Sequence, residues 1–320
     1  MAVKLYKRRM LGVKTDTTQS LASSAATPPA FASSDYLPAY DFTISPIIEQ
    51  LDSTVVSPNL GSPANVPGLK NYDVDLKFWL RGANSAGAMN GPIDALFSAA
   101  GLVFDGNGKY VASSSNITNF LGPAKSVTIN GNYDGTAMQC QGTVGNMKLV
   151  FEQGKKVDMN FTGKGLYTSS AFDEARLPSG SYGATIEPNV QSIGFQIGGT
   201  LFTADKVEVD FGNAITAISD VNSPNGIGGY IITDRKPVGT LMALAVNVAQ
   251  YDFFGRFDSG SVASGSLTVG TQTGNKFVFE FNSIQYSDVK WANQNGLINV
   301  EATLKFNEDD TNPWLQVTAL

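Results

Sequence analysis

The stretch DVDLKFWLRGANSAGAMNGPIDALFSAAGL, residues 73–102, predicts a strand, a loop and one short helix in succession. Every second residue from Val74 to Leu80 is apolar, which is the period-two pattern of a half-buried strand. The loop 82–91 is rich in small residues, has no periodicity, and is expected to be exposed or to contact a neighbour. Pro92 stands where the first helical residue belongs, and Gly101 follows the last one. The helix then has one apolar face, made of Ile93, Leu96, Phe97 and Ala100.

Composition favours a β-rich protein whose surface is partly hidden in an assembly. Charged residues make up only 16% of the 320 residues, and there are 33 glycines. This length is sufficient for two domains. The net charge of −6 argues against a general nucleic-acid binder, because phosphate binding needs clustered Lys and Arg.

The residue inventory excludes most catalytic and metal chemistry. The chain has no histidine, which removes the commonest general base and the Ser-His-Asp and Cys-His arrangements. Cys140 is the one cysteine, so an intrachain disulfide and a cysteine metal cluster are excluded, and a buried strand position is expected for it. We predict no catalytic, cofactor-binding or metal-binding residue and no cofactor. No membrane span or secretion signal is expected, and a soluble protein assembled in a cytoplasm is the default.

Composition also divides the chain into an arm and two domains. Residues 1–40 are polar, small and proline-containing, and predict either a disordered tail or an extended arm ordered by a neighbouring subunit. Residues 41–175 and 176–320 are the two predicted domains, with the boundary in the polar connector 168–190. Residues 103–124 read as an insertion in the first domain, and DGNG is its predicted hairpin turn.

The predicted elements follow the same order in both domains. In the first, strands around Pro46 and a long loop at 57–71 precede the segment 73–102, and four strands follow, at 126–130, 136–143, 147–152 and 156–167. In the second, strands at 206–211 and 215–218, a loop at 219–237 and a strand at 240–246 precede a helix-like segment at 250–260 and strands at 262–269, 276–283 and 295–306. The offset is about 164 residues from Thr43 to Val207 and about 166 from Leu76 to Met242, which indicates an internal duplication.

Several of these segments resemble the major tail tube proteins of long-tailed (siphovirus-type) bacteriophages and prophages. LKFWLRGANSAGAMNGPIDALFSAAGL is similar to their stretch of LRG, small residues and P-x-x-x-L-L-x-A-x-G. MKLVFEQGKKVDMNFTGKGLY is similar to their strand, glycine turn and F-x-F-x-G-x-Y strand. VEVDFGNAITAISDVNSPNGIGGYIITDRKPVGTL and the opening KRRMLGVKTDTTQ also match the family pattern. The chain departs from it at Ile93 and Asp94, where an aromatic pair is common, and in its long loop 103–124.

The resemblance implies a mainly β fold with two tandem β-sandwich or barrel tail-tube modules. Each module carries one short flanking α-helix, and an extended N-terminal arm precedes them. Such modules join side by side so that their strands close a central barrel, which removes the open strand edges. The loops 57–71 and 219–237 and the arm are then the expected contacts between stacked rings.

The implied function is that of a structural virion protein without enzymatic activity. Stacked rings form the phage tail tube, whose lumen conducts DNA into the host during ejection, and the protein is located in the virion tail after assembly in the host cytoplasm. The implied partners are other copies of the chain, the tape measure protein and genomic DNA in the lumen, and the tail terminator and baseplate or distal tail protein at the ends, with no membrane. Carboxylates facing the lumen would repel phosphate, and the first candidates are Glu152, Asp158, Glu280 and Glu301.

Two ring stoichiometries remain open. If both halves are tube modules, a ring of three chains has pseudo-sixfold symmetry, and this is the interpretation we adopt. If one half is an outer decoration, the ring needs six chains.

Three other functions are alternatives. An enzyme with paired carboxylates would use residues such as Asp173 and Glu174, but these lie in a connector without a pocket signal. A receptor- or carbohydrate-binding β-sandwich would stack sugars on exposed aromatic residues, for which the candidates are Trp79, Trp291, Trp314 and Tyr230. A tail-terminator or capsid-stabilising protein of the same virion would form single rings.

Overall fold

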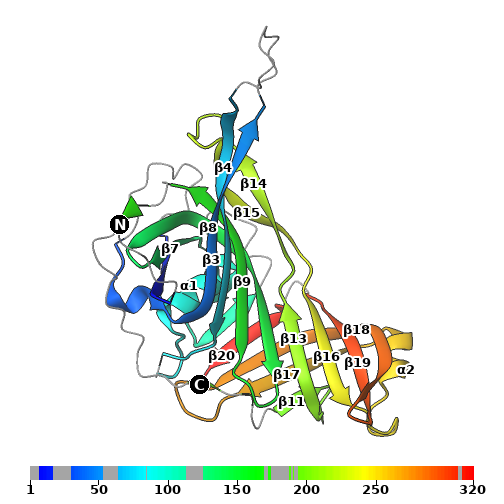
Figure 1. Cartoon of the computed structure of the whole chain (residues 1–320). Helices are drawn as coiled ribbons and strands as arrows, with labels where there is room; N and C mark the ends of the chain where they lie inside the picture. The colour runs from blue at the N-terminus through cyan, green and yellow to red at the C-terminus, as the bar shows by residue number, and fades with distance from the viewer. Residues whose placement is uncertain are drawn as a thin grey trace.

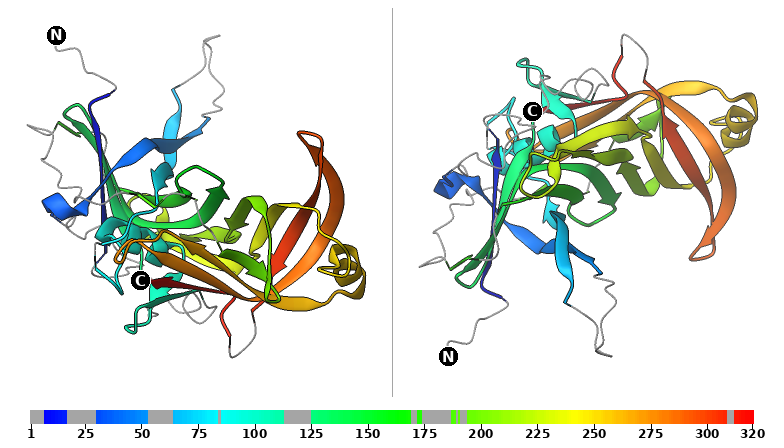
Figure 2. Two further views of the ribbon diagram at one scale, coloured as in Figure 1. Left: turned by 90° about the horizontal axis from the view of Figure 1, so that it is seen from below. Right: turned by 90° about the horizontal axis from the view of Figure 1, so that it is seen from above.

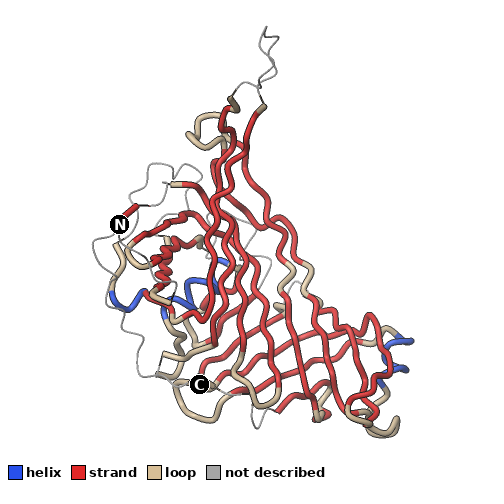
Figure 3. Tube along the Cα trace, viewed as in Figure 1, coloured by secondary structure: helices blue, strands red, loops and turns tan. Residues whose placement is uncertain are grey.

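The computed structural model describes residues 7–16, 30–52, 64–83, 85–112, 125–168, 172–173, 187–188, 190, 194–308 and 312–320. Within these ranges the protein is mainly β, as predicted, with two α-helices (Figures 1 and 3). The predicted domain boundary at 175/176, Glu174, residues 1–6 and 17–29 of the arm and residues 113–124 of the insertion lie outside the described residues.

The first half of the chain contributes one 3-10 turn, one helix and ten strands to the described structure. The helical elements are η2 (Ser33–Asp35) and α1 (Gly91–Ala99). The strands are β1 (Arg9–Thr15), β2 (Tyr36–Leu37), β3 (Ala39–Leu51), β4 (Val66–Trp79), β5 (Leu102–Phe104), β6 (Lys109–Ala112), β7 (Val127–Tyr133), β8 (Thr136–Glu152), β9 (Asp158–Tyr167) and β10 (Phe172–Asp173).

The second half contributes one helix, α2 (Phe253–Ser259), and ten further strands. They are β11 (Gly194–Ile197), β12 (Thr200–Leu201), β13 (Ala204–Asp210), β14 (Asn213–Ser219), β15 (Ile227–Arg235), β16 (Val238–Leu244), β17 (Val262–Val269), β18 (Phe277–Gln294), β19 (Leu297–Phe306) and β20 (Leu315–Ala319). The two helices lie far apart, and the hairpins β3–β4 and β14–β15 project from the same end of the molecule (Figure 1).

The antiparallel ladders follow the same order in both halves. In the first half the order is β3, β4, β9, β8, β7 and β1. In the second half β13 pairs with β16, and the order continues through β19, β18, β17 and β11. The β14–β15 hairpin continues the β13–β16 pair. In the first half, the outer part of the long β3–β4 hairpin continues the inner part of the same hairpin in the same way.

The register makes individual residues equivalent. Phe42 lies opposite Leu76, and Val207 lies opposite Leu241, so both strands are offset by 165 residues, from 42 to 207 and from 76 to 241. Both hairpins also carry a β-bulge at the same point. The register shifts between Ile48 and Gln50 in one hairpin and between Ala214 and Ile215 in the other.

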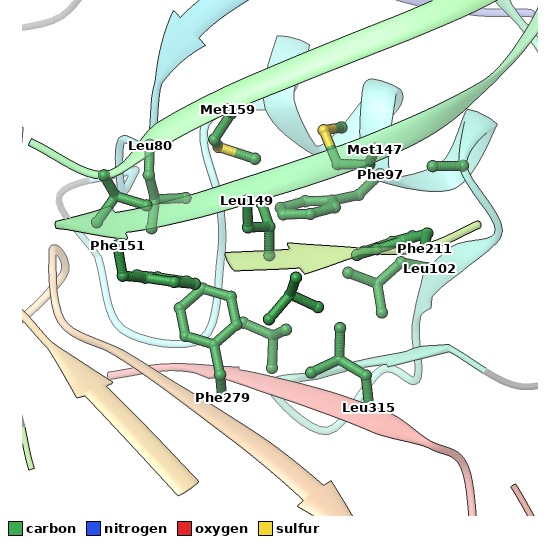
Figure 4. Close-up of a cluster of buried hydrophobic side chains, with 14 of the residues drawn as sticks. Leu80, Phe97, Leu102, Met147, Leu149, Phe151, Met159, Phe211, Phe279 and Leu315 are labelled. Carbon is green, nitrogen blue, oxygen red and sulfur yellow. The ribbon is translucent and has the colours of Figure 1, made fainter. Parts of the chain in front are cut away.

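A single core extends through both halves. Its largest cluster of buried side chains contains residues from β1 to β20. At its centre Phe151 of β8 meets Phe279 of β18 edge to face, with ring centroids 5.1 Å apart (Figure 4). Phe211 and Trp314 make a second edge-to-face contact at 5.1 Å. Burial of such large apolar side chains is the main stabilising contribution, about 25 cal/mol for each Å² removed from water.

The helix prediction is confirmed. Ile93, Leu96, Phe97 and Ala100 are all fully buried, so the apolar face of α1 packs on the core. The loop that precedes α1 contacts the second half of the same chain. The Gly82 amide donates to Asn275 Oδ1 at 2.9 Å, and the Gly87 amide donates to the Ala319 carbonyl at 3.0 Å.

Several strand boundaries differ from the prediction because long strands bend instead of ending. The expected break at Pro46 is wrong, since β3 runs through it; proline is tolerated on a strand edge that carries no ladder bond. The expected turn at 144–146 is also wrong, because β8 continues through a bulge between Gln141 and Val144. The polar stretch around Trp291 belongs to β18, which ends at a tight turn where Asn295 and Gly296 have positive φ.

The first part of the predicted insertion has a structural role. Residues 102–112 form the β5–β6 hairpin, with its turn at the expected DGNG. Strand β6 pairs with β20, the last strand of the chain, so that Val317 lies opposite Tyr110. This hairpin therefore joins the second half to the first.

Candidate functional site: a strand joint and two open edges

The two halves are joined by direct pairing of strands. The end of β8 pairs on one side with β9 and on the other with β13. In the ladder to β13, Phe151 lies opposite Val207 and Leu149 lies opposite Val209. All four side chains are buried, so the joint is both a hydrogen-bonded ladder and part of the core. The views from below and from above show the sheet continuing through the joint (Figure 2).

One face of this continuous sheet is mostly polar. Alternate residues of β9, β8, β13, β16, β19 and β18 place half-buried or exposed polar side chains side by side, including Asp158, Asn160, Lys148, Glu208, Thr240, Thr303, Glu301 and Lys290. We call this set the polar face. The intervening side chains, such as Val207 and Leu241, point into the core.

Ion pairs neutralise many charges on the polar face. Glu208 accepts from Lys148 at 2.8 Å and from Lys206 at 2.5 Å. Burial alone would raise the pKa of Glu208, but the hydrogen bonds from these two lysines hold the pKa below its ordinary value. Glu208 is therefore charged and paired at neutral pH.

The four predicted lumen carboxylates all have partners. Glu152 pairs with Lys155 at 2.6 Å, Glu280 with Lys109 at 3.6 Å, and Glu301 with Lys290 at 3.3 Å. The Tyr40 hydroxyl donates to Asp158 Oδ1 at 2.7 Å. Glu152, Asp158 and Glu301 lie on the sheet that continues across the joint, whereas Glu280 lies where β18 pairs with β17 and β20. The structure therefore brings three of the four onto connected strands and pairs them with cations or a hydroxyl group.

The second half ends in a strand edge that matches the joint. By the register with β9 and β19, Leu149 and Trp291 hold equivalent positions, because their cross-strand partners are Met159 and Val300. In the described chain, residues 286–294 of β18 pair only with β19. Trp291 is 60% exposed and contacts Phe254 of α2, with ring centroids 4.8 Å apart. Further exposed apolar residues lie at the adjacent turn, namely Leu297 and Ile298.

The first half begins with the complementary edge. Strand β3 pairs with β4, and its other edge has no strand partner among the described residues. Two side-chain bonds cover it there. The Ile44 amide donates to the Tyr133 hydroxyl at 3.3 Å, and Arg9 Nη1 donates to the Phe42 carbonyl at 3.3 Å. Phe42 is equivalent to Val207, so this edge corresponds to the edge of β13 that receives β8.

The aromatic candidates for sugar stacking are not gathered at one surface. Trp314 and Tyr230 are buried. Trp79 is half-buried and lies between Tyr40, which stacks on it at 5.0 Å, and Lys156, whose ammonium lies 3.8 Å from the ring centroid. Trp291 is thus the exposed member of the set, and it lies at the β18 edge.

The metal and cysteine chemistry considered from the sequence gives no site in the described residues. No group of three or more Cys, Asp or Glu there is arranged to hold a metal ion. Cys140 is buried as predicted, and burial raises the pKa of its thiol to about 12, which keeps it protonated and unreactive. No described helix has the length and apolarity needed to cross a bilayer.

Comparisons with known proteins do not add a relative. No protein-family model matches the chain, and no curated protein matches it.

Proposed function

We propose that this protein is a structural subunit of a phage tail tube that assembles head to tail into rings. The observation that carries the proposal is the intrachain joint between β8 and β13, together with the corresponding edges of β18 and β3, which have no strand partner among the described residues. A strand edge that stays open invites pairing with another chain, and a repeated head-to-tail contact builds rings or filaments.

The proposed contact between copies repeats the joint inside the chain. The end of β18 in one copy adds to β3 in the next, so that Trp291 lies opposite Ile44, as Leu149 lies opposite Val209. Each addition supplies backbone hydrogen bonds and covers apolar side chains that are exposed in the single chain, such as Ile298.

The equal ladder order of the two halves supports the interpretation that the chain is two tandem tail-tube modules. A ring of three chains then contains six modules in pseudo-sixfold arrangement. The alternative is a ring of six chains, in which one half serves as an outer decoration.

The polar face is the proposed wall of the lumen through which DNA passes. Three of its lysines, Lys148, Lys206 and Lys290, are held by carboxylates, so these three are not free to grip phosphate groups. A wall of paired charges and hydroxyl groups offers a phosphate backbone no strong fixed site, which suits a conduit better than a binding protein.

Electron microscopy of the purified protein tests the proposal. We expect rings or tubes, and a symmetry-resolved reconstruction with three chains per ring. Six chains per ring would overturn the two-module interpretation while leaving the tube function. Monodisperse monomers at high concentration and with the tail partners present would overturn the tube function.

A further inference from the structure

The β14–β15 hairpin of the second half packs on the first half. Ile227, Tyr230 and Ile232 of this hairpin form a buried cluster with Val144 of β8 and Leu166 of β9. We call the surface that receives the hairpin, between β4, β9 and β8, the inner groove.

The base of the same hairpin is fixed by a polar clamp. Asn213 Nδ2 donates to the Ala100 carbonyl at 2.9 Å and to the Gly145 carbonyl at 3.0 Å. Arg235 donates to the Ala100 carbonyl at 2.8 Å and through Nε to Asn213 Oδ1 at 2.8 Å. The hairpin thereby caps the end of α1 in the first half.

The equivalent groove in the second half is an open cavity of about 550 Å³. Its walls are residues 234–238 and 305–308 together with Ser287 and Trp314. Residues 234–238 are equivalent to 69–73 of the first half, by the offset of 165 that relates Leu76 to Leu241. Residues 305–308 are equivalent to 164–167, by the offset of 141 that relates Phe161 to Ala302. In the first half, both of these ranges lie around the inner groove. Arg235 Nη1 is buried there without a hydrogen-bond partner in the described structure.

The hairpin equivalent to β14–β15 is β3–β4, and its polarity differs in a matched way. Ile215 and Ile232 are cross-strand partners that correspond to Gln50 and Pro67. On the receiving side, Leu166 corresponds to Asn307. Where the β14–β15 hairpin meets the inner groove, the residues of the hairpin and of the groove are therefore apolar. At the equivalent place, Gln50 of the β3–β4 hairpin and Asn307 of the cavity are both polar.

We infer that the cavity lined by Arg235, Asn307 and Trp314 receives the β3–β4 hairpin of a second copy of this chain. The inference rests on the proposed function and adds to the strand joint a second contact between the same two copies. The cavity has apolar walls at Val238, Phe306 and Trp314 and polar groups at Arg235 and Asn307, so a hairpin seated in it would bury apolar surface and meet polar partners. The difference in polarity also discriminates against seating the wrong hairpin, because Gln50 would lose its hydrogen bonds in the inner groove.

Disulfide trapping tests this contact. The only native cysteine, Cys140, is buried, so introduced cysteines report specifically. We expect the double variant Gln50→Cys, Asn307→Cys to form covalent dimers and trimers under mild oxidation, seen on a non-reducing gel. The variants Gln50→Cys and Asn307→Cys alone are the controls and should give far fewer covalent trimers, because each lacks the partner thiol.

A matched pair within the chain calibrates the geometry. Ile232→Cys with Leu166→Cys joins two buried members of the same cluster and should form an intrachain disulfide that leaves the mass on the gel unchanged. If rings form but the Gln50 and Asn307 pair gives no cross-linked copies while the intrachain pair closes, the inferred contact is wrong and the tube function stands. If no rings form and no copies cross-link, both are wrong.

Discussion

Leu149 of β8 and Trp291 of β18 hold the same position in their ladders, but Leu149 is fully buried and Trp291 is 60% exposed. Leu149 is covered because the second half follows it through the joint with β13, and it lies beside Phe151 and Phe279 in the shared core (Figure 4). At Trp291 no second strand of the described chain supplies that cover. The difference between these two residues defines the end of the molecule at which we place the next copy.

A charge at this end should stop assembly without unfolding the chain. Trp291→Glu places a carboxylate where we propose that β3 of the next copy pairs, so burial on assembly would cost several kcal/mol, about 3 or more. We expect monomers by analytical ultracentrifugation, with an unchanged circular dichroism spectrum.

Val248→Glu is the matched control, because Val248 is also highly exposed but lies in the loop before α2. This variant should still form rings. Rings of normal stability from Trp291→Glu would contradict the proposed edge.

The shared core predicts that the two halves unfold together. Phe279→Ala removes a fully buried ring that contacts Phe151, and the expected loss is about 3–5 kcal/mol in the free energy of unfolding. Phe254→Ala, at a partly exposed ring, should cost about 1 kcal/mol or less in the single chain. Urea titration followed by circular dichroism and tryptophan fluorescence checks this, and two separate transitions with only one displaced would contradict a common core.

Gly212 should be far less tolerant of a side chain than another glycine with positive φ. Its φ is 63°, and a Cβ atom there would lie 2.0 Å from the Lys236 carbonyl oxygen. Gly106 has a φ of 81°, but nothing lies within 4 Å of its Cβ position. Gly106→Ala should therefore cost only the backbone strain of about 1–2 kcal/mol. Gly212→Ala should cost about 3 kcal/mol or more, because the β13–β14 connection must shift, and equal melting temperatures would refute this account.

Glu208 should contribute to stability in a pH-dependent way. Its pKa in the folded protein is lowered, because the hydrogen bonds from Lys148 and Lys206 outweigh the effect of burial. Its contribution is therefore fully present above the ordinary pKa of about 4.5 and is lost as the pH falls through the lowered value. Glu208→Gln should destabilise the protein at pH 7 and reduce the loss of stability on acidification. Thermal melts between pH 7 and pH 3 check this, and parallel curves for the two proteins would count against it.

A charge exchange should report on the contact between copies. Arg235 donates a hydrogen bond to the Asn213 side chain, and the backbone amide of Asn213 donates to Asn146 Oδ1 at 3.0 Å. By the register, the residue equivalent to Arg235 is Lys70, and the residue equivalent to Asn146 is the exposed Asp288. Lys70→Glu alone should weaken ring formation by about 1 kcal/mol at each joint. Adding Asp288→Lys should restore it, as measured by the concentration dependence of ring formation. Failure of the double variant to recover, with both chains folded, would argue against this placement.

Short-range features were predictable from the sequence. The alternation in 73–80 and the spacing of Ile93, Leu96 and Phe97 depend on neighbouring residues and on the fixed periods of strand and helix. The repeated order of the elements was also predictable, because its offset of about 165 residues is visible in the sequence. The ends of the long strands were less predictable, because a bulge lets β8 and β18 bend where polar or glycine residues suggest a turn.

The arrangement of the site required the tertiary structure. Nothing local marks Phe151 as the partner of Val207, or Val317 as the partner of Tyr110, because any strand edge offers the same backbone donors and acceptors. The packing of the whole core decides which edges meet. It also decides the exposure of Trp291, because the neighbouring sequence does not distinguish this residue from a buried strand residue. The sequence by itself thus determined the elements and their repetition, while the tertiary structure decided which two edges are joined within the chain and which two stay open.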